Sequence, residues 1–153
     1  MNDVIVPLNL PQANLKLTKQ GQVLYVWCIL RQKKLVLTPE EWVRQHWIHY
    51  LIHAFDYPMS LMQAEKTIVL NGLTRRCDLV VFDRHGSPQL ILECKAPDIV
   101  LNQKVLMQIA QYNAKLQVKF LILSNGIHHF VGEVNYQDAQ FIAVSKVPNY
   151  QEL

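Results

Sequence analysis

Three ionisable residues, Asp78, Glu93 and Lys95, interrupt or border stretches that are otherwise typical of buried strands. Successive side chains of a strand point to opposite faces, so Glu93 and Lys95 share one face while Cys94 points to the other. Charges against an apolar core are costly unless they are paired or hold a metal ion. The spacing therefore predicts that two carboxylates and one ammonium group converge at one edge of a sheet.

Such a group can perform metal-dependent phosphodiester hydrolysis. Two carboxylate oxygens, with a backbone carbonyl and waters, make the hard oxygen site that octahedral Mg²⁺ prefers. A bound ion of this kind neutralises a phosphodiester and activates a water, while Lys95 orients that water or stabilises the transition state. The predicted ligands are Asp78, Glu93 and the backbone carbonyl of Cys94, and Mn²⁺ is expected to replace Mg²⁺.

The elements that must position these residues follow from apolar periodicity and turn signals. Residues 78–82 predict a strand that begins at Asp78, and 89–95 predict a second strand antiparallel to it. The apolar run 119–123 follows through a predicted helix over 102–116, so a right-handed crossover makes it a parallel neighbour of 89–95. The expected architecture is an α/β fold with a mixed central sheet flanked by helices.

Other segments extend this architecture. Thr38 and Pro39 predict the start of a helix that runs to about Phe55, capped by Thr38, and Asn102 predicts the cap of the second helix. The buried stripes are expected to be Val43, Trp47, Ile48, Leu51 and Phe55 in the first helix, and Val105, Ile109, Tyr112 and Leu116 in the second. Further strands are expected at 22–30, 35–37, 64–70, 128–134 and 140–144, with a turn at Asn71-Gly72.

Length and composition predict one domain over 1–153, with an extended segment at 1–20 and a core at about 22–145. With 50% hydrophobic residues, the chain is not of the disordered class. The net charge of +3 permits a polyanionic partner, although the pair Arg75-Arg76 can be a solvated turn. We expect no membrane span and, because the N-terminus lacks a basic leader with an apolar run, a cytoplasmic location.

The pattern Asp78…Glu93-Cys94-Lys95 resembles the D…ExK core of PD-(D/E)xK nucleases. Gln108 and Tyr112 match a Q-x-x-x-Y pattern found on the following helix in related branches. Taken with segments 38–44, 71–73, 93–97, 108–113 and 124–126, the chain is similar to the N-terminal nuclease domain of type I restriction enzyme R subunits over roughly residues 22–136.

This resemblance implies a restriction-endonuclease-like three-layer fold and endonuclease activity, with DNA favoured over RNA. It implies that Gln108 positions the site and that Glu41, or its neighbour Glu40, adds a metal ligand. The alternative for Glu41 is a capping box with Thr38, which requires the same residue. Candidate contacts to the substrate are Arg44, Tyr112 and Arg76, with pairing to Glu41, packing and solvation as their respective alternatives.

Two departures from the family pattern bear on function. Cys77 stands where the family motif has proline, and the 153 residues contain no G-x-x-x-x-G-K-[ST] phosphate loop. We therefore expect this chain to lack a motor and to rely on a separate motor or specificity partner, with homodimerisation as a route to cutting both strands. The alternative function is a catalytically silent nucleic-acid-binding or scaffolding module with the same fold.

Overall fold

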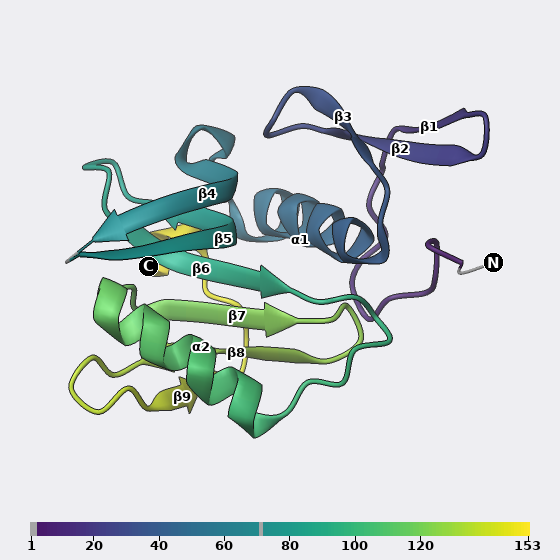
Figure 1. Ribbon diagram of the computed structural model, residues 1–153. Coiled ribbons are helices and arrows are strands. Elements are labelled where there is room, and N and C mark those ends of the chain that lie inside the picture. The colour runs from purple at the N-terminus through teal and green to yellow at the C-terminus, as the bar shows by residue number, and fades with distance from the viewer. Residues whose placement is uncertain (1–2, 71) are drawn as a thin grey trace.

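The computed structural model describes residues 3–70 and 72–153, and its centre is a six-stranded mixed sheet (Figure 1). The sheet has the order β4-β5-β6-β7-β8-β9. Its strands are β4 (Met62–Leu70), β5 (Leu73–Phe82), β6 (Pro88–Cys94), β7 (Phe120–Ser124), β8 (His129–Val134) and β9 (Phe141–Ala143). A separate small sheet contains β1 (Leu17–Gln20), β2 (Val23–Cys28) and β3 (Lys33–Val36).

The two helices start where the sequence predicts. Helix α1 (Pro39–Phe55) is capped by Thr38, whose hydroxyl accepts a hydrogen bond from the backbone N–H of Glu41 at 3.0 Å. Helix α2 (Gln103–Leu116) is capped by Asn102, whose side chain accepts from a backbone N–H of the first turn at 2.9 Å. Both caps satisfy N–H groups that have no partner within the helix. Two 3-10 turns, η1 (Met59–Leu61) and η2 (Tyr150–Glu152), complete the elements.

The helices cover opposite faces of the large sheet. The α1 face buries Leu79, Val81, Leu90 and Leu92. The α2 face buries Val80, Ile91, Leu121 and Leu123. Neighbouring residues of one strand thus face different helices, as strand alternation requires. The predicted three-layer α/β fold is confirmed.

Strand directions also agree with the sequence prediction. Strands β5 and β6 are antiparallel, whereas β6 and β7 are parallel, with Leu90 opposite Phe120 and Leu92 opposite Ile122. The crossover between β6 and β7 contains α2. The final hairpin of β8 and β9 is present as well. The parallel pair brings the carboxyl ends of β6 and β7 to the same edge, where Lys95 follows β6 and donates its backbone N–H to Ser124 at 2.8 Å.

Three expectations about the edges of the domain need correction. The strands before α1 do not join the central sheet, and Figure 1 shows α1 between the two sheets. Residues 17–20, expected only as extended chain, pair with β2, and their polar sequence gave no apolar alternation to reveal this. The core also continues past residue 145, because Val147, Tyr150 and Leu153 pack on the α1 side. Residue 71 of the predicted turn lies outside the described residues.

The buried stripe of α2 differs from its prediction. The buried side chains are Leu106, Ile109, Ala110, Asn113 and Leu116, whereas Val105 is partly buried and Tyr112 is 43% exposed. The Asn113 amide donates to the carbonyls of Val118 and Phe120 at 3.3 and 3.2 Å. These bonds fix the rotation of α2 and turn Tyr112 outward. Likewise Phe55 of α1 is only partly buried. Over the described ranges, no helix is long and apolar enough to cross a membrane.

Candidate active site

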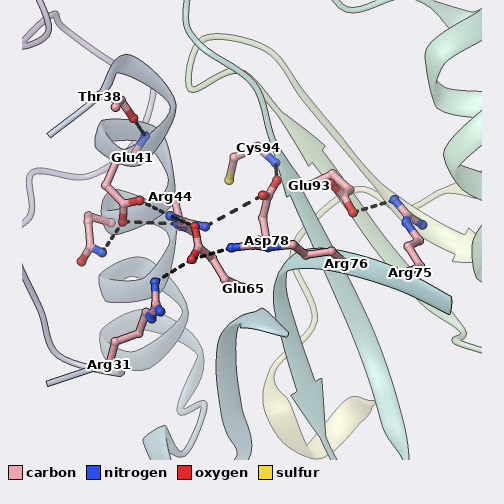
Figure 2. A network of polar contacts seen from close by, with 11 residues as sticks. Arg31, Thr38, Glu41, Arg44, Glu65, Arg75, Arg76, Asp78, Glu93 and Cys94 are labelled. Carbon is pink, nitrogen blue, oxygen red and sulfur yellow. Dashed lines mark hydrogen bonds and ion pairs between the residues drawn. The ribbon is translucent and has the colours of Figure 1, made fainter. Parts of the chain in front are cut away.

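Asp78 lies where β5 and β6 separate. The last paired residues are Leu79 and Leu92, and beyond them Asp78 Oδ2 accepts the backbone N–H of Cys94 at 2.7 Å (Figure 2). The prediction that Asp78 begins its strand was wrong, because β5 starts at Leu73 and its first part pairs with β4 alone. Where β5 and β6 diverge, the side chain of Asp78 therefore takes the place of a backbone carbonyl as the hydrogen-bond acceptor between them.

The carboxyl group of Glu93 lies beside that of Asp78. Extending the register of β5 and β6 by one residue sets the two opposite each other. Burial raises the pKa of Glu93, and the charge and hydrogen bonding of Asp78 raise it further, against Arg75 and Lys95, to about 8. The two carboxyl groups that the sequence predicts to converge do lie together.

A partly buried arginine, Arg75, holds Glu93 in place. Arg75 Nη2 donates to Glu93 Oε1 at 2.6 Å, and the side chains are 12% and 11% exposed (Figure 2). The Arg75 guanidinium also lies over the ring of Tyr112, 4.9 Å from its centroid. A solvated turn was therefore the wrong interpretation for Arg75. Its i+3 spacing from Asp78 on a strand gave no signal for this contact, which depends on the tertiary position of Glu93.

The two residues of the Q-x-x-x-Y pattern have different surroundings. Gln108 is exposed on α2, whereas Tyr112 reaches the site through Arg75. The structure thus connects Tyr112, rather than Gln108, to the two carboxyl groups. The role expected for Gln108 stays a prediction.

Lys95 stands at the open end of the site. It is partly buried directly after β6, and its charge lowers the pKa of both Glu93 and Glu40. Burial raises the pKa of Glu40, and the charge of Asp78 raises it further. Lys95 and Glu40 are therefore close enough to the carboxyl pair to act on it electrostatically.

The Glu41 carboxylate makes the ion pair with Arg44 that the sequence allowed as an alternative for Arg44, and its role as a metal ligand stays a prediction. Its carboxylate accepts hydrogen bonds from the guanidinium of Arg44 and from Gln45 Nε2, the latter at 2.7 Å. Thr38 does cap the helix, but the Glu41 carboxylate pairs with Arg44 rather than completing a capping box. The other acid at the start of α1 is Glu40, whose pKa is raised by burial and by the charge of Asp78.

Glu65 belongs to the site although no pattern in the sequence marked it. This residue of β4 has φ +51°, in the left-handed region that non-glycine residues rarely adopt. Its carboxylate binds Arg31, Arg44 and Arg76 at 2.6, 3.1 and 2.9 Å (Figure 2). Burial alone would raise the pKa of Glu65, but the three arginines lower it. No sequence signal identifies a left-handed residue within a strand.

Arg44 connects this ion network to the carboxyl pair. Its Nη1 lies 3.9 Å from Asp78 Oδ1, while its other nitrogens bind Glu41 and Glu65. Burial lowers the pKa of Arg44, but the hydrogen bond with Glu41 and the negative charges of Glu41, Glu65 and Asp78 raise it overall. Arg44 therefore stays positively charged next to Asp78, and Arg76 lies in the same network rather than in a free basic patch.

The donor atoms fit a hard divalent cation in their chemistry. Asp78 Oδ2 and Glu93 Oε1 accept the hydrogen bonds described above, whereas Asp78 Oδ1, which lies 3.9 Å from Arg44 Nη1, and Glu93 Oε2 accept neither of them. A cation between them would offset the burial and the charge of Asp78, which together raise the pKa of Glu93. In the part of the chain that the structure describes, no three His, Cys, Asp or Glu residues form a metal-binding group. A metal here would complete its shell with backbone carbonyls or waters.

A cleft of about 570 Å³ opens next to the site, between the small sheet and α1. Residues of β3, the first turns of α1, β4 and the segment after β6 line it, among them Val36, Glu40, Arg44, Glu65 and Ala96. The cleft is therefore lined in part by the ion network of Arg44 and Glu65. Lys95 directly precedes Ala96, which also lines the cleft. The cleft is large enough to admit part of a substrate beside the carboxyl pair.

The sequence of residues 39–148 matches the family described as type I restriction enzyme R protein N terminus (HSDR_N). The chain belongs to this family. No curated protein gives a significant match. The family segment contains α1 and the whole six-stranded sheet, and with them both carboxyl groups, Lys95 and the arginines that hold them. The small sheet precedes the family segment.

Proposed function

We propose that this protein is a Mg²⁺-dependent nuclease that hydrolyses phosphodiester bonds in DNA. One observation carries the proposal: the carboxyl groups of Asp78 and Glu93 lie together beside Lys95, in a chain of the type I restriction enzyme R protein N-terminal family. An ion pair that serves only stability needs one acid and one base, so it does not explain why Asp78 and Glu93 lie next to each other.

The residues have separable tasks in this proposal. Asp78 and Glu93 would hold the metal through Oδ1 and Oε2, with the backbone carbonyl of Cys94 as a further ligand. When bound, Mg²⁺ neutralises the phosphodiester and lowers the pKa of a water. Lys95 orients the attacking water or neutralises charge on the phosphate oxygens. Gln108 would position the site through contacts that form with substrate.

The groups around the carboxyl pair keep it in a fixed arrangement before substrate arrives. The Cys94 N–H holds Asp78 and the Arg75 guanidinium holds Glu93. Arg44, fixed by Glu41 and Glu65, places a permanent positive charge beside Asp78 and next to the cleft. Tyr112 stacks on Arg75 and restrains it. Such prior positioning reduces the reorganisation needed during the reaction.

Cleavage of plasmid and linear DNA in Mg²⁺ or Mn²⁺ tests the proposal. Glu93→Ala should abolish cleavage, whereas Glu133→Ala, an acid of β8 that is 38% exposed, should leave it unchanged. Cleavage that persists at the wild-type rate in Glu93→Ala would overturn the proposal. A parallel assay with RNA of the same sequence tests the preference for DNA.

Calorimetric titration separates this enzyme from a catalytically silent binding module. The wild type should take up Mg²⁺ or Mn²⁺, and Asp78→Asn should lose that uptake. A protein that binds DNA but takes up no divalent ion at these acids would support the silent module instead.

A further inference from the structure

The face of the small sheet that carries Trp27 has an ordered row of side chains. Trp27 lies opposite Lys34 in the β2–β3 register. On the other side, the backbone N–H of Trp27 donates to the carbonyl of Lys16 at 3.0 Å, which extends the β1–β2 register to that pair. Side chains of opposed residues in adjacent strands point to the same face. The indole of Trp27 is therefore flanked by a lysine on either side.

A second row continues the same face. Tyr25 lies opposite Thr18 on one side and Val36 on the other. Tyr25 and Trp27 are both partly exposed, and Val36 is 52% exposed. The intervening Val26 is fully buried, so the face with the two aromatic rings is the outer one.

The charge of this region is unlike that of the rest of the chain. Residues 1–38 contain five basic residues, Lys16, Lys19, Arg31, Lys33 and Lys34, against one acid, Asp3, which gives a net charge of +4. Because the whole chain has a net charge of +3, residues 39–153 carry −1. All four lysines are exposed. The positive charge that would attract a polyanion is thus concentrated on and around the small sheet.

We propose that the outer face of the small sheet binds single-stranded nucleic acid. Unpaired bases stack on Trp27 and Tyr25, and the phosphates between them contact Lys16 and Lys34. Aromatic rings that alternate with basic residues on a sheet are suited to this ligand, because each base offers a π-face and each phosphate a negative charge. A duplex keeps its bases stacked within the helix and would use the lysines alone.

The position of this face relates it to the candidate active site. Val36 belongs both to the second row and to the lining of the cleft, which continues to Glu40 and Ala96. A single-stranded nucleic acid bound to the outer face could therefore pass over β3 into the cleft. As a substrate-binding surface, this inference rests on the proposed nuclease function, whereas the binding itself needs no metal and no cleavage.

Binding of the full chain to a 5′-labelled oligothymidylate in EDTA tests the inference. Lys16→Ala/Lys34→Ala should weaken binding about 10- to 30-fold near 0.1 M salt and lower the slope of log K against log salt by about 1.4, which is two phosphate contacts. The matched control is Lys115→Ala/Lys146→Ala, which removes the same charge from exposed positions elsewhere. An equal loss of affinity in the two double variants would overturn the inference.

Tryptophan fluorescence tests the stacking contact separately. Oligothymidylate should quench the wild type, and Trp27→Leu should lose most of that quenching and bind about fivefold or more weakly. Trp27→Phe keeps an aromatic ring and should retain most of the affinity, which separates stacking from misfolding. The inference falls if a duplex binds as tightly as the single strand and Trp27→Leu binds like the wild type. Because EDTA prevents cleavage, the binding measurement does not depend on nuclease activity. A protein that fails to cleave DNA can still bind the oligothymidylate, and one that fails to bind it on this face can still cleave DNA.

Discussion

The two sheets of this molecule differ in charge and in burial. The large sheet is buried on both faces and contains a pair of acids in a segment with net charge −1, whereas the small sheet has an exposed face in a segment with net charge +4. Carboxylates suited to a metal ion repel a polyanion until the metal is bound. In the proposed function, attraction of nucleic acid and chemistry on it therefore belong to different parts of the fold.

The strongest test of this division compares one substitution from each sheet. Asp78→Asn should lower the rate of DNA cleavage by about 10³-fold or more, because it removes a predicted metal ligand. Lys16→Ala/Lys34→Ala should raise the substrate concentration needed for half-maximal rate and leave the rate at saturation near that of the wild type. Steady-state kinetics on a labelled oligonucleotide measures both. A fall in the saturated rate of the lysine variant would contradict the division.

A second test compares what each sheet contributes to stability. Leu92 is fully buried beneath α1, so Leu92→Ala should lower the free energy of unfolding by about 3–5 kcal/mol. Leu35 of the small sheet is only partly buried, and Leu35→Ala should cost about 1 kcal/mol. Urea denaturation measures both. Similar losses in the two variants would mean that the small sheet is part of the main cooperative core.

The sequence predicted the large sheet better than the small one, for a physical reason. Strands β6 and β7 are apolar runs that only a doubly covered position explains, and the helix between them requires the parallel crossover. The small sheet has no such constraint. The polar residues 17–20 pair through their backbone, so their side chains gave no alternation to recognise. The separation into two sheets depends on packing around α1, which no local pattern contains.

The site was predictable where it depends on local geometry. A strand–turn–strand places Asp78 near Glu93, whereas Lys95, predicted by strand alternation to share the face of Glu93, follows the end of β6. The groups that hold these acids come from distant parts of the chain. Arg75 pairs with Glu93 across 18 positions, and Glu65 binds three arginines from a left-handed backbone conformation. Such contacts follow from tertiary packing, so residue type and spacing could not indicate them.

In the absence of metal, the raised pKa of Glu93 in the large sheet should make the free energy of unfolding depend on pH. Burial and Asp78 raise the pKa of Glu93 from an ordinary 4.5 to about 8, so the folded protein holds this proton more tightly than the unfolded chain. The resulting stabilisation is complete below about pH 4.5 and is lost as the pH rises towards 8. Urea denaturation in EDTA should show a fall on the order of 2–4 kcal/mol between pH 5 and pH 8.

Two variants assign that pH dependence to one sheet. Glu93→Gln cannot lose a proton at this position, so its stability should vary much less over the same range. Lys16→Ala/Lys34→Ala should keep the slope of the wild type, because its charges lie on the other sheet. A slope that is unchanged in Glu93→Gln would place the titrating group elsewhere.

The smallest expected effect concerns two turns with left-handed glutamines, one in each part of the molecule. Gln117 ends α2 with φ +56°, and Gln32 lies in the β2–β3 turn with φ +53°. Glycine adopts this conformation without strain, so Gln117→Gly should raise the free energy of unfolding by about 0.5–1 kcal/mol. Gln32→Gly should gain less, because the Gln32 side chain donates to the carbonyl of Ile29 at 2.5 Å and that bond is lost. Thermal unfolding of the two variants side by side decides this, and a larger gain from Gln32→Gly would show that this hydrogen bond contributes little to the small sheet.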